Sequence, residues 1–472
     1  MKTKYLLLLL SVITVFSCQD PDEFLDVIPT GTTIPTTLED FDLMLQDYAI
    51  LRSVGTHTRY KDPDVFHSDV TYITIANDPI SVNAYNWQYD IFNAEQSDVD
   101  YNNYYYYIHV MNQILQDIDQ AESGNFNAAN RPSLKAQALG QRAMEYFLAV
   151  NQYAPHYDPN NPDVPGIPMP LSIDLQAQLG RSTVGEVYNR IKTDLEQAIS
   201  ILPDNMPAIN SYANFRPGKA SLYALLAEVN LFMGDFDEAV INSDIALSLY
   251  DYLYDYNDID LVNSTNVWSG YTAPASNDWY VGTLNREVLW HRYNFWGFAN
   301  PHHLYAPKLE ALYDKPNDRR WYLFSASSTS GGVDVSPYSL YAYPRSERCI
   351  GMSVPRLMLT NAEAKARTND GPGAITVLNT LLSKRLTVFT PLTHSDDLTT
   401  LQTIKNERRK ELAGTSINLF DQKRYHVYSD AVLLTYTRTN PQTGETFTLE
   451  PGSDGYVINI AESIRNINPN LN

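Results

Sequence analysis

Residues 183–203, TVGEVYNRIKTDLEQAISILP, contain the clearest helical pattern in the chain. Their apolar side chains recur at steps of three and four residues, which places them on one face of an amphipathic helix. Thr183 and Glu186 have the spacing of a capping box, and Pro203 ends the pattern. The apolar stripe consists of Val184, Val187, Tyr188, Ile191, Leu195, Ala198, Ile199 and Leu202. The sequence therefore predicts a helix over residues 184–202.

Residues 217–250 and 356–385 have the pattern of two helical hairpins. The first contains the turn Gly234-Asp235, and residues 371–373, Gly-Pro-Gly, divide the second. The first also has the length of a tetratricopeptide unit, about 34 residues, in which small side chains let two helices pack closely. The small residues are Ala220, Ala224, Ala227, Ala239 and Ala246. We interpret both hairpins as tetratricopeptide-like scaffold, and ordinary helices of a globular domain are the alternative.

Further helical periodicity lies on both sides of this centre, so we predict a mostly α-helical fold. Residues 55–103 show no sustained period, and the tail after residue 412 is expected to form short strands and loops. No domain boundary is evident within residues 38–472, which we predict to form a single domain. The other predicted helices cover residues 38–51, 104–118, 134–153 and 401–412.

Residues 251–344 differ from the rest of this predicted domain in composition. Helical periodicity is scarce here, Asn, Asp, Ser, Gly and Pro are frequent, and five of the 6 tryptophans lie in this region. Residues 287–292 are predicted to form a short strand. A region of this length is too long for a structureless connection in a compact domain. We therefore predict an irregular, aromatic-rich insertion with short strands that carries a binding function.

The chain of 472 residues is acidic, with 34 Lys and Arg against 55 Asp and Glu and a formal net charge of −21. This charge argues against nucleic-acid binding and against electrostatic adhesion to anionic lipid. The chain also contains 34 Tyr and 6 Trp. Such an excess of amphipathic rings indicates half-exposed recognition surfaces in addition to a core.

The N-terminus has the features of an export signal. Lys2 and Lys4 precede an apolar run over residues 5–16, and Ser17-Cys18 follow it. The apolar run is too short to span a bilayer as a mature helix. It indicates a segment that is removed after export.

This N-terminus resembles a bacterial lipoprotein signal, which implies removal of residues 1–17 and acylation of Cys18. A conventional signal peptide with a chance cysteine is the alternative. Residues 18–37 then form a flexible tether, and Cys349 is left as a lone thiol, so no disulfide framework is expected. The start of the tether resembles the surface-export signal of some Gram-negative lipoproteins, through Gln19, Asp20, Asp22 and Glu23.

Short motifs recur along the chain in a definite order. In the first half they are Tyr107-Ile108 with Asn112 and Leu115, Arg142-Ala143 with Tyr146-Phe147, Tyr153 with Tyr157, Gly166-Ile167-Pro168, and Arg181-Ser-Thr-Val184 with Val187-Tyr188 and Asp194-Leu195. In the second half they are Asp318-Arg319, Ala362-Glu-Ala364 with Leu378-Asn379 and Arg385, and Glu407-Arg-Arg-Lys-Glu-Leu412 with Asp421 and Arg424.

These motifs, in this order, resemble the SusD/RagB-like surface lipoproteins of nutrient uptake in Bacteroidetes. The resemblance runs from the lipoprotein signal to beyond Arg424 and so covers most of the chain. One departure is that Thr415, Ser416 and Asn418 stand where the family usually has Glu-Gly and then Arg. The resemblance implies a SusD-like fold with tetratricopeptide-like helix pairs.

The resemblance also implies a location and a task. The protein would be anchored through Cys18 on the outer surface of the outer membrane, as a lid over a SusC-like TonB-dependent transporter. Its ligand would be an oligosaccharide or polysaccharide, although some members of the family bind peptides. The implied task is binding without catalysis, and no cofactor, metal or nucleic acid is expected.

A sugar presents C–H faces and hydroxyl rims, which suit flat aromatic rings and polar side chains respectively. We therefore predict solvent-facing ligand residues in both irregular regions, while Trp290 and Trp321 lie in apolar runs and are assigned to the core. In the first region the predicted residues are Asn83, Tyr85, Asn86 and Trp87. In the insertion they are Trp268, Tyr271, Asn277, Asp278, Trp279, Tyr280 and Trp296.

Each alternative function predicts a different structural feature. A RagB-like peptide receptor would present a deep apolar cleft, and a tetratricopeptide adaptor would bind on its concave helical face. A secreted glycoside hydrolase would place two acidic side chains about 5–9.5 Å apart across a groove. The sequence contains no zinc motif, nucleophile elbow or phosphate loop. One loop contains four acidic residues, Asp251, Asp255, Asp258 and Asp260. It lacks the Gly and Glu of an EF-hand, so we interpret it as a solvated loop.

Overall fold

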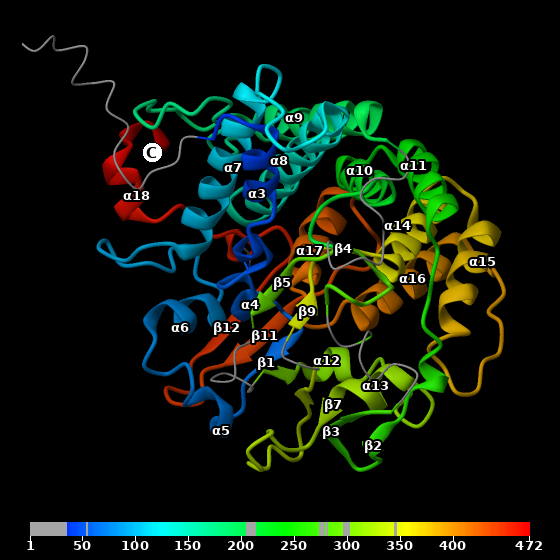
Figure 1. Ribbon diagram of the computed structural model, residues 1–472. Helices are drawn as coiled ribbons and strands as arrows, with labels where there is room; N and C mark the ends of the chain where they lie inside the picture. The colour runs from blue at the N-terminus through cyan, green and yellow to red at the C-terminus, as the bar shows by residue number, and fades with distance from the viewer. Residues whose placement is uncertain are drawn as a thin grey trace, which may run out of the picture.

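The computed structural model describes residues 35–52, 55–203, 214–272, 279, 282–295, 303–343 and 347–472 (Figure 1). Helices dominate this part of the chain and its strands are short, which confirms the predicted mostly α-helical fold. The predicted signal, Cys18 and most of the tether lie outside the described residues. Within the described residues, no helix combines the length and the apolar character that crossing a membrane requires.

The long helices follow one another in an arc across the molecule (Figure 1). α8 (Arg131–Tyr153) packs against both α7 (Val99–Asp117) and α9 (Val184–Ile201). The hairpin of α10 (Lys219–Met233) and α11 (Phe236–Leu249) comes next, with α10 against α9. This confirms the predicted helix 184–202 and the hairpin in 217–250.

The arc continues through the second predicted hairpin. α14 (Val354–Arg367) packs against α11 and against both α15 (Gly371–Leu382) and α16 (Asp397–Glu411). Residues 371–373 are not a turn between helices, as the sequence suggested, but the first turn of α15. Asp370 caps that turn, since its Oδ1 accepts a hydrogen bond from Gly373 N at 3.0 Å. A Gly-Pro pair is tolerated there, because the backbone N–H groups of a first helical turn have no helical partner.

Local chemistry explains where α9 and α10 begin and end. Thr183 Oγ1 accepts a hydrogen bond from Glu186 N at 3.1 Å, and Glu186 Oε2 accepts one from Thr183 N at 2.8 Å. The predicted capping box is therefore formed. Gly234 has φ 79° and closes α10 in the left-handed conformation that side chains disfavour.

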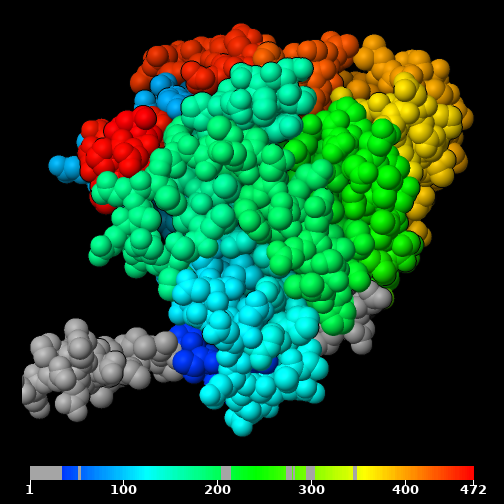
Figure 2. Space-filling model, turned by 90° about the horizontal axis from the view of Figure 1, so that it is seen from above, coloured from blue at the N-terminus to red at the C-terminus, as the bar shows by residue number. Residues whose placement is uncertain are grey.

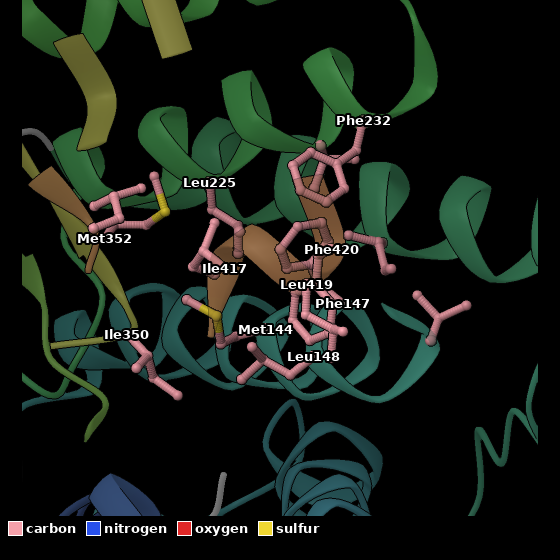
Figure 3. Packing of buried hydrophobic residues seen from close by; sticks show 14 of the residues in the cluster. Met144, Phe147, Leu148, Leu225, Phe232, Ile350, Met352, Ile417, Leu419 and Phe420 are labelled. Carbon is pink, nitrogen blue, oxygen red and sulfur yellow. The ribbon is translucent and has the colours of Figure 1, made fainter. Parts of the chain in front are cut away.

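The core is assembled around α17 (Ile417–Val427), a helix that the sequence pattern missed. Figure 3 shows its Ile417, Leu419 and Phe420 between the side chains of α8 and those of α10. Nearly every residue of α17 is buried, including several charged ones, so it has no polar face and no amphipathic period. One continuous cluster of buried apolar side chains extends from Tyr60 to Leu471.

Other segments also contain more helix than predicted. The 38–51 segment divides into α3 (Leu38–Leu45) and a 3₁₀ turn (Tyr48–Arg52). The supposedly irregular 55–103 segment contains short helices, which have too few residues to show a period. They are α4 (Thr58–Lys61), α5 (Asp69–Tyr72) and α6 (Pro79–Tyr85), and the C-terminal tail adds α18 (Glu462–Ile467).

The insertion carries the short strands that were predicted for it. β2 (Leu261–Asn263) pairs with β3 (Asn266–Tyr271), and β4 (Val288–Trp290) pairs with β10 (Met352–Ser353), all antiparallel. A four-stranded sheet has the order β1-β6-β8-β7. Its strands, in that order, are Val65–Phe66, Leu304–Tyr305, Leu340–Tyr341 and Ser325–Ala326. Two other pairs are β5 (Tyr293–Phe295) with β9 (Glu347–Cys349) and β11 (Tyr436–Thr439) with β12 (Thr446–Leu449).

Two short helices complete the lower part of the view in Figure 1, α12 (Pro307–Glu310) and α13 (Arg319–Phe324). Because β1 comes from the N-terminal segment, the sheet ties the insertion to the start of the fold. Strand β10 ties the insertion to α14 in the same way.

The motifs that carry the family resemblance serve the scaffold as buried ion pairs. Arg142 Nε donates to Asp194 Oδ2 at 2.8 Å and so joins α8 to α9. Arg408 is fully buried and donates to Glu228 Oε1 at 2.6 Å and to Asp421 Oδ2 at 2.7 Å, which joins α16 to α10 and α17. These motifs mark the fold.

Candidate functional site

The predicted residues of the first irregular region lie in or just after α6. Tyr85 is 0% and Trp87 5% exposed, so the expectation of solvent-facing rings is wrong for both. Trp87 Nε1 donates to Lys61 O at 2.8 Å, and the Arg438 guanidinium lies over both rings at 4.3 and 4.2 Å. Asn83 Nδ2 donates to a backbone carbonyl at 3.2 Å, and Asn86, which is half-buried, caps α6. These four residues therefore form packed contacts between α6 and other segments of the chain.

The predicted residues of the insertion are divided between strand β3 and segments outside the described residues. Tyr271 is buried and its hydroxyl donates to Leu323 O at 2.9 Å. Trp268 is half-buried, with Nε1 donating to Ser328 O at 2.8 Å. The residues outside the described part of the chain are Asn277, Asp278, Tyr280 and Trp296.

Trp279 lies at the centre of an aromatic cluster and is 3% exposed. Its ring stacks on Phe324 with the centroids 5.4 Å apart, and it meets the edges of Tyr271 at 4.7 Å and Tyr256 at 5.6 Å. Asn285 Nδ2 donates to the Trp279 carbonyl at 2.6 Å and fixes its backbone. Trp279, which was predicted as an exposed loop residue, therefore lines a cavity and does not form an exposed platform. Its ligand-binding role stays a prediction.

We call this cavity the aromatic cleft. It has a volume of about 80 Å³ and lies where the insertion meets the segments 348–355 and 411–412. Its aromatic walls are Tyr256, Trp279, Phe324 and Tyr343, and its polar residues include Asn285, Glu287, His291, Arg348, Ser353 and Glu411. At about 30 Å³ for each water molecule, it holds about three waters. Its described part is large enough for a substituent of a ligand.

One polar side chain of the aromatic cleft has no hydrogen-bond partner among the described residues. His291 is 1% exposed, and neither ring nitrogen has a hydrogen-bond partner among the described residues. Burial, with a contribution from the charge of Arg292, lowers the pKa of His291 to about 3, so the ring is neutral and offers one donor and one acceptor. Arg348 lies over the Tyr343 ring at 4.6 Å and donates from Nε to Ala413 O at 3.2 Å.

Glu287 and Glu411 are the acidic residues of the aromatic cleft, and both bind the same arginine. Arg385 donates from Nη2 to Glu287 Oε1 at 2.8 Å and from Nε to Glu411 Oε1 at 3.1 Å. Burial raises the pKa of Glu287, with Arg385 offsetting part of the effect. The pKa of Glu411 is lowered, because Arg385 and Arg320 outweigh its burial. Both carboxylates are thus held in a structural ion-pair network.

The acidic loop of the insertion forms ion pairs as well. Asp255 accepts from Lys384 Nζ at 3.0 Å, and Asp260 accepts from Arg319 Nη2 at 2.8 Å. Across the described ranges, no three His, Cys, Asp or Glu side chains are grouped so that they could hold a metal ion.

Sequence reasoning missed Phe324, Tyr343 and Arg348 as cleft residues. Phe324 ends the short helix α13, and the other two lie on either side of a gap in the described chain. No local pattern distinguishes them from core residues. Only the fold brings them to Trp279, because they are separated from it by more than forty positions in the sequence.

The fold defines a helical scaffold with an inserted, aromatic-lined region, and the family models identify its class. The model described as "Starch-binding associating with outer membrane" matches residues 23–231, and the "SusD family" model matches residues 357–469. Together the two matches span more than half of the chain. The chain belongs to the SusD/RagB family.

Solved structures of this family share the fold. A SusD superfamily protein from Bacteroides thetaiotaomicron superposes with a TM-score of 0.69 at 19% identity, over 92% of this chain and 99% of that one. A SusD-like carbohydrate-binding protein from Bacteroides vulgatus has a TM-score of 0.63 at 20% identity, over 93% and 98%. A SusD superfamily protein from Bacteroides fragilis has a TM-score of 0.68 at 20% identity, over 93% and 100%. A search of the curated proteins found no match.

Proposed function

We propose that this protein captures oligosaccharide or polysaccharide at the outer surface of the outer membrane and delivers it to a SusC-like TonB-dependent transporter. The observation that carries the proposal is family membership, since the matched model is described as starch-binding and as associating with the outer membrane. Acylation of Cys18 would hold the protein there, because the apolar run of its signal is too short to remain as a membrane span.

The aromatic cleft and the strand beside it are the proposed ligand region. Trp279 forms the wall of the cleft, and Trp268 is half-buried on β3 in the same aromatic cluster. A sugar hydroxymethyl or hydroxyl group would enter the cleft and bond to His291, while the rest of the glycan would lie outside it. The residues that would complete this surface are Asn277, Asp278, Tyr280 and Trp296.

We propose binding without turnover. A glycosidase needs one protonated acid and one free carboxylate on opposite sides of the scissile bond. Glu287 and Glu411 are 4% exposed each and share Arg385, so neither carboxylate has a free face for a glycosidic oxygen.

Native affinity gels that each contain one polysaccharide test this function. We expect retarded migration with at least one polysaccharide and a weaker retardation after Trp268→Ala. Trp321→Ala is the matched control, because Trp321 is also half-buried against the same cluster but was assigned to the core and not to the site. Equal retardation of both variants and the unmodified protein would contradict the proposed site. Migration that no polysaccharide changes would contradict the function.

The peptide-receptor alternative is tested with the same protein. Peptide mixtures that protect it against thermal unfolding, in the absence of any polysaccharide effect, would favour a RagB-like receptor. We expect the opposite pattern.

A further inference from the structure

A second cavity lies away from the aromatic cleft, between the loop after α8, helix α17 and the segment 452–457. These segments lie side by side along the upper edge of Figure 2, where the blue-green and the orange-red parts of the chain meet. We call it the lysine cleft. Its volume is about 210 Å³. Its lining residues include His156, Asn161, Val164, Lys423, His426 and Ser453.

Lys423 is a buried lysine on the floor of the lysine cleft. It is 5% exposed, and its Nζ donates to Asn151 O at 2.5 Å and to Ala154 O at 3.0 Å. No Asp or Glu of the described chain forms an ion pair with it. An ammonium has three donors, so one N–H of Lys423 remains for a ligand. Burial lowers the pKa of Lys423 to about 7, so a carboxylate ligand would bind the protonated form of its side chain.

The cleft also contains polar atoms without partners. His156 is 5% exposed, and neither of its ring nitrogens has a hydrogen-bond partner among the described residues; the Ser453 hydroxyl oxygen is buried and equally without one. Native proteins complete such groups with water or ligand, because an unsatisfied buried polar group is destabilising. Burial, followed by the charges of Lys423 and Arg424, lowers the pKa of His156 well below its usual value. The ring is therefore neutral and can both donate and accept.

The walls of the lysine cleft supply apolar contacts, and the charged groups at its buried end differ from those at its open end. Pro155, Val164 and Val427 supply C–H surface. Asp158 and Asp454 stand toward the mouth, where an anionic ligand group would be repelled and a hydroxyl group accepted. A ligand would therefore place its negative charge inward against Lys423 and its hydroxyl groups outward.

The size of the cavity restricts the ligand further. At about 30 Å³ for each water molecule, 210 Å³ holds about seven waters. This is less than the space of a typical drug-sized pocket, about 300–1,000 Å³, and suits one ring with its substituents.

We propose that the lysine cleft binds a single sugar acid, a molecule with one sugar-sized ring that carries one carboxylate, with the carboxylate on Lys423 and the hydroxyl groups on His156, Ser453 and the mouth residues. The lysine cleft shares no lining residue with the aromatic cleft. Its occupation does not depend on glycan capture there.

Ligand-observed saturation-transfer NMR with the full chain tests the proposal, with D-glucuronate as the probe. We expect saturable binding of D-glucuronate, at least tenfold weaker binding of D-glucose, which has the ring without the charge, and at least tenfold weaker binding of acetate, which has the charge without the ring. Lys423→Met keeps the aliphatic stem and should weaken glucuronate binding at least tenfold. Lys405→Met is the matched control, a buried lysine on α16 that lies outside the lysine cleft and should leave binding unchanged.

A second variant keeps the test decisive if Lys423→Met fails to fold. Asn161 is exposed at the mouth, so Asn161→Trp should fill the cleft and abolish binding without changing the melting temperature. The proposal is overturned by absence of glucuronate binding, by equal binding of glucose or acetate, or by unchanged binding in the folded Asn161→Trp variant.

Discussion

Glu228 has no exposed surface, yet it carries a charge at the junction of α10, α14 and α16. Arg356 Nη2 and Arg408 Nη2 donate to its Oε1 at 2.9 and 2.6 Å, and the Thr360 hydroxyl donates to Oε2. Burial disfavours the ionised carboxylate, but Arg356 and Arg408 outweigh it and lower the pKa of Glu228 to about 2. The Glu228 carboxylate therefore compensates the positive charge of two buried guanidinium groups, those of Arg356 and Arg408.

Glu228→Gln is expected to lower the free energy of unfolding by about 3–5 kcal/mol, because it leaves buried arginine charge without compensation. Urea unfolding followed by far-ultraviolet circular dichroism measures the change. Glu238→Gln, on the exposed start of α11, is the control and should change stability by less than about 0.5 kcal/mol. A loss below about 1 kcal/mol for Glu228→Gln would contradict the assigned role.

The same residue predicts a pH dependence. The pKa of Glu228 is lower in the folded state, about 2, than its ordinary value of 4.5, so the unfolded chain binds more protons between these values. The stabilisation is full above pH 4.5 and is lost as the pH falls toward 2. The difference in stability between the unmodified protein and Glu228→Gln should therefore shrink over this window. A difference that stays constant from pH 7 to pH 3 would contradict the ionised state.

At the scale of elements, the α10–α11 hairpin depends on the backbone conformation of Gly234. Its φ of 79° is disfavoured for L-residues, and a Cβ there would make only an ordinary contact with Tyr428, at 3.7 Å. Gly234→Ala should therefore lower stability by about 1 kcal/mol through the backbone alone. Gly180→Ala, where an added Cβ would come no closer than 3.5 Å to its neighbour Asn470, is the control and should not destabilise in thermal unfolding. Equal melting temperatures of the two variants would contradict this explanation.

Helix 184–202 was predicted well because it has an exposed and a buried face. The hairpin in 217–250 was predicted from its small residues and its Gly-Asp turn, although α10 is buried on nearly all sides, and residues 287–292 contain β4. Helix α17 was missed because it is buried on all sides and includes charged residues that are paired internally. The short helices before α7 were missed because a single helical turn has no measurable period.

The site was less accessible to sequence reasoning than the fold. Aromatic residues between polar ones predicted exposed rings, but Trp87 and Trp279 are buried, because Arg438 and Phe324 pack against their faces. These partners lie far away in the sequence. Trp290 was correctly assigned to the core, since it is 0% exposed. The lysine cleft left no sequence signal, since its residues come from three separate segments.

At the scale of the whole molecule, the helical arc supports the insertion (Figure 1). The four-stranded sheet joins the insertion to the N-terminal segment, and β10 joins it to α14. The C-terminal residues close the molecule against the segment that follows α8. Asn468 Nδ2 donates to Leu179 O at 2.8 Å, and Asn470 Nδ2 donates to Gln178 O at 2.7 Å. These bonds join the C-terminus to the segment that precedes α9.

Cys18→Ala is expected to release the protein from the membrane fraction, because the acyl chains on Cys18 are its proposed attachment. Fractionation of cells that produce the variant, followed by immunoblotting, measures the distribution. Cys349→Ala is the matched control and should remain with membranes, since its thiol lies in the fold beside the Trp290 carbonyl. Membrane partitioning of Cys18→Ala equal to that of the unmodified protein would refute the anchor.

Isothermal titration with oligosaccharides from a polysaccharide that retards the protein, followed by chromatography of the recovered sugar, tests the central claim most directly. The claim is glycan capture without turnover. We predict saturable binding and full recovery of the intact oligosaccharide. Absence of saturable binding to any oligosaccharide, or the appearance of shorter sugars with new reducing ends, would contradict it.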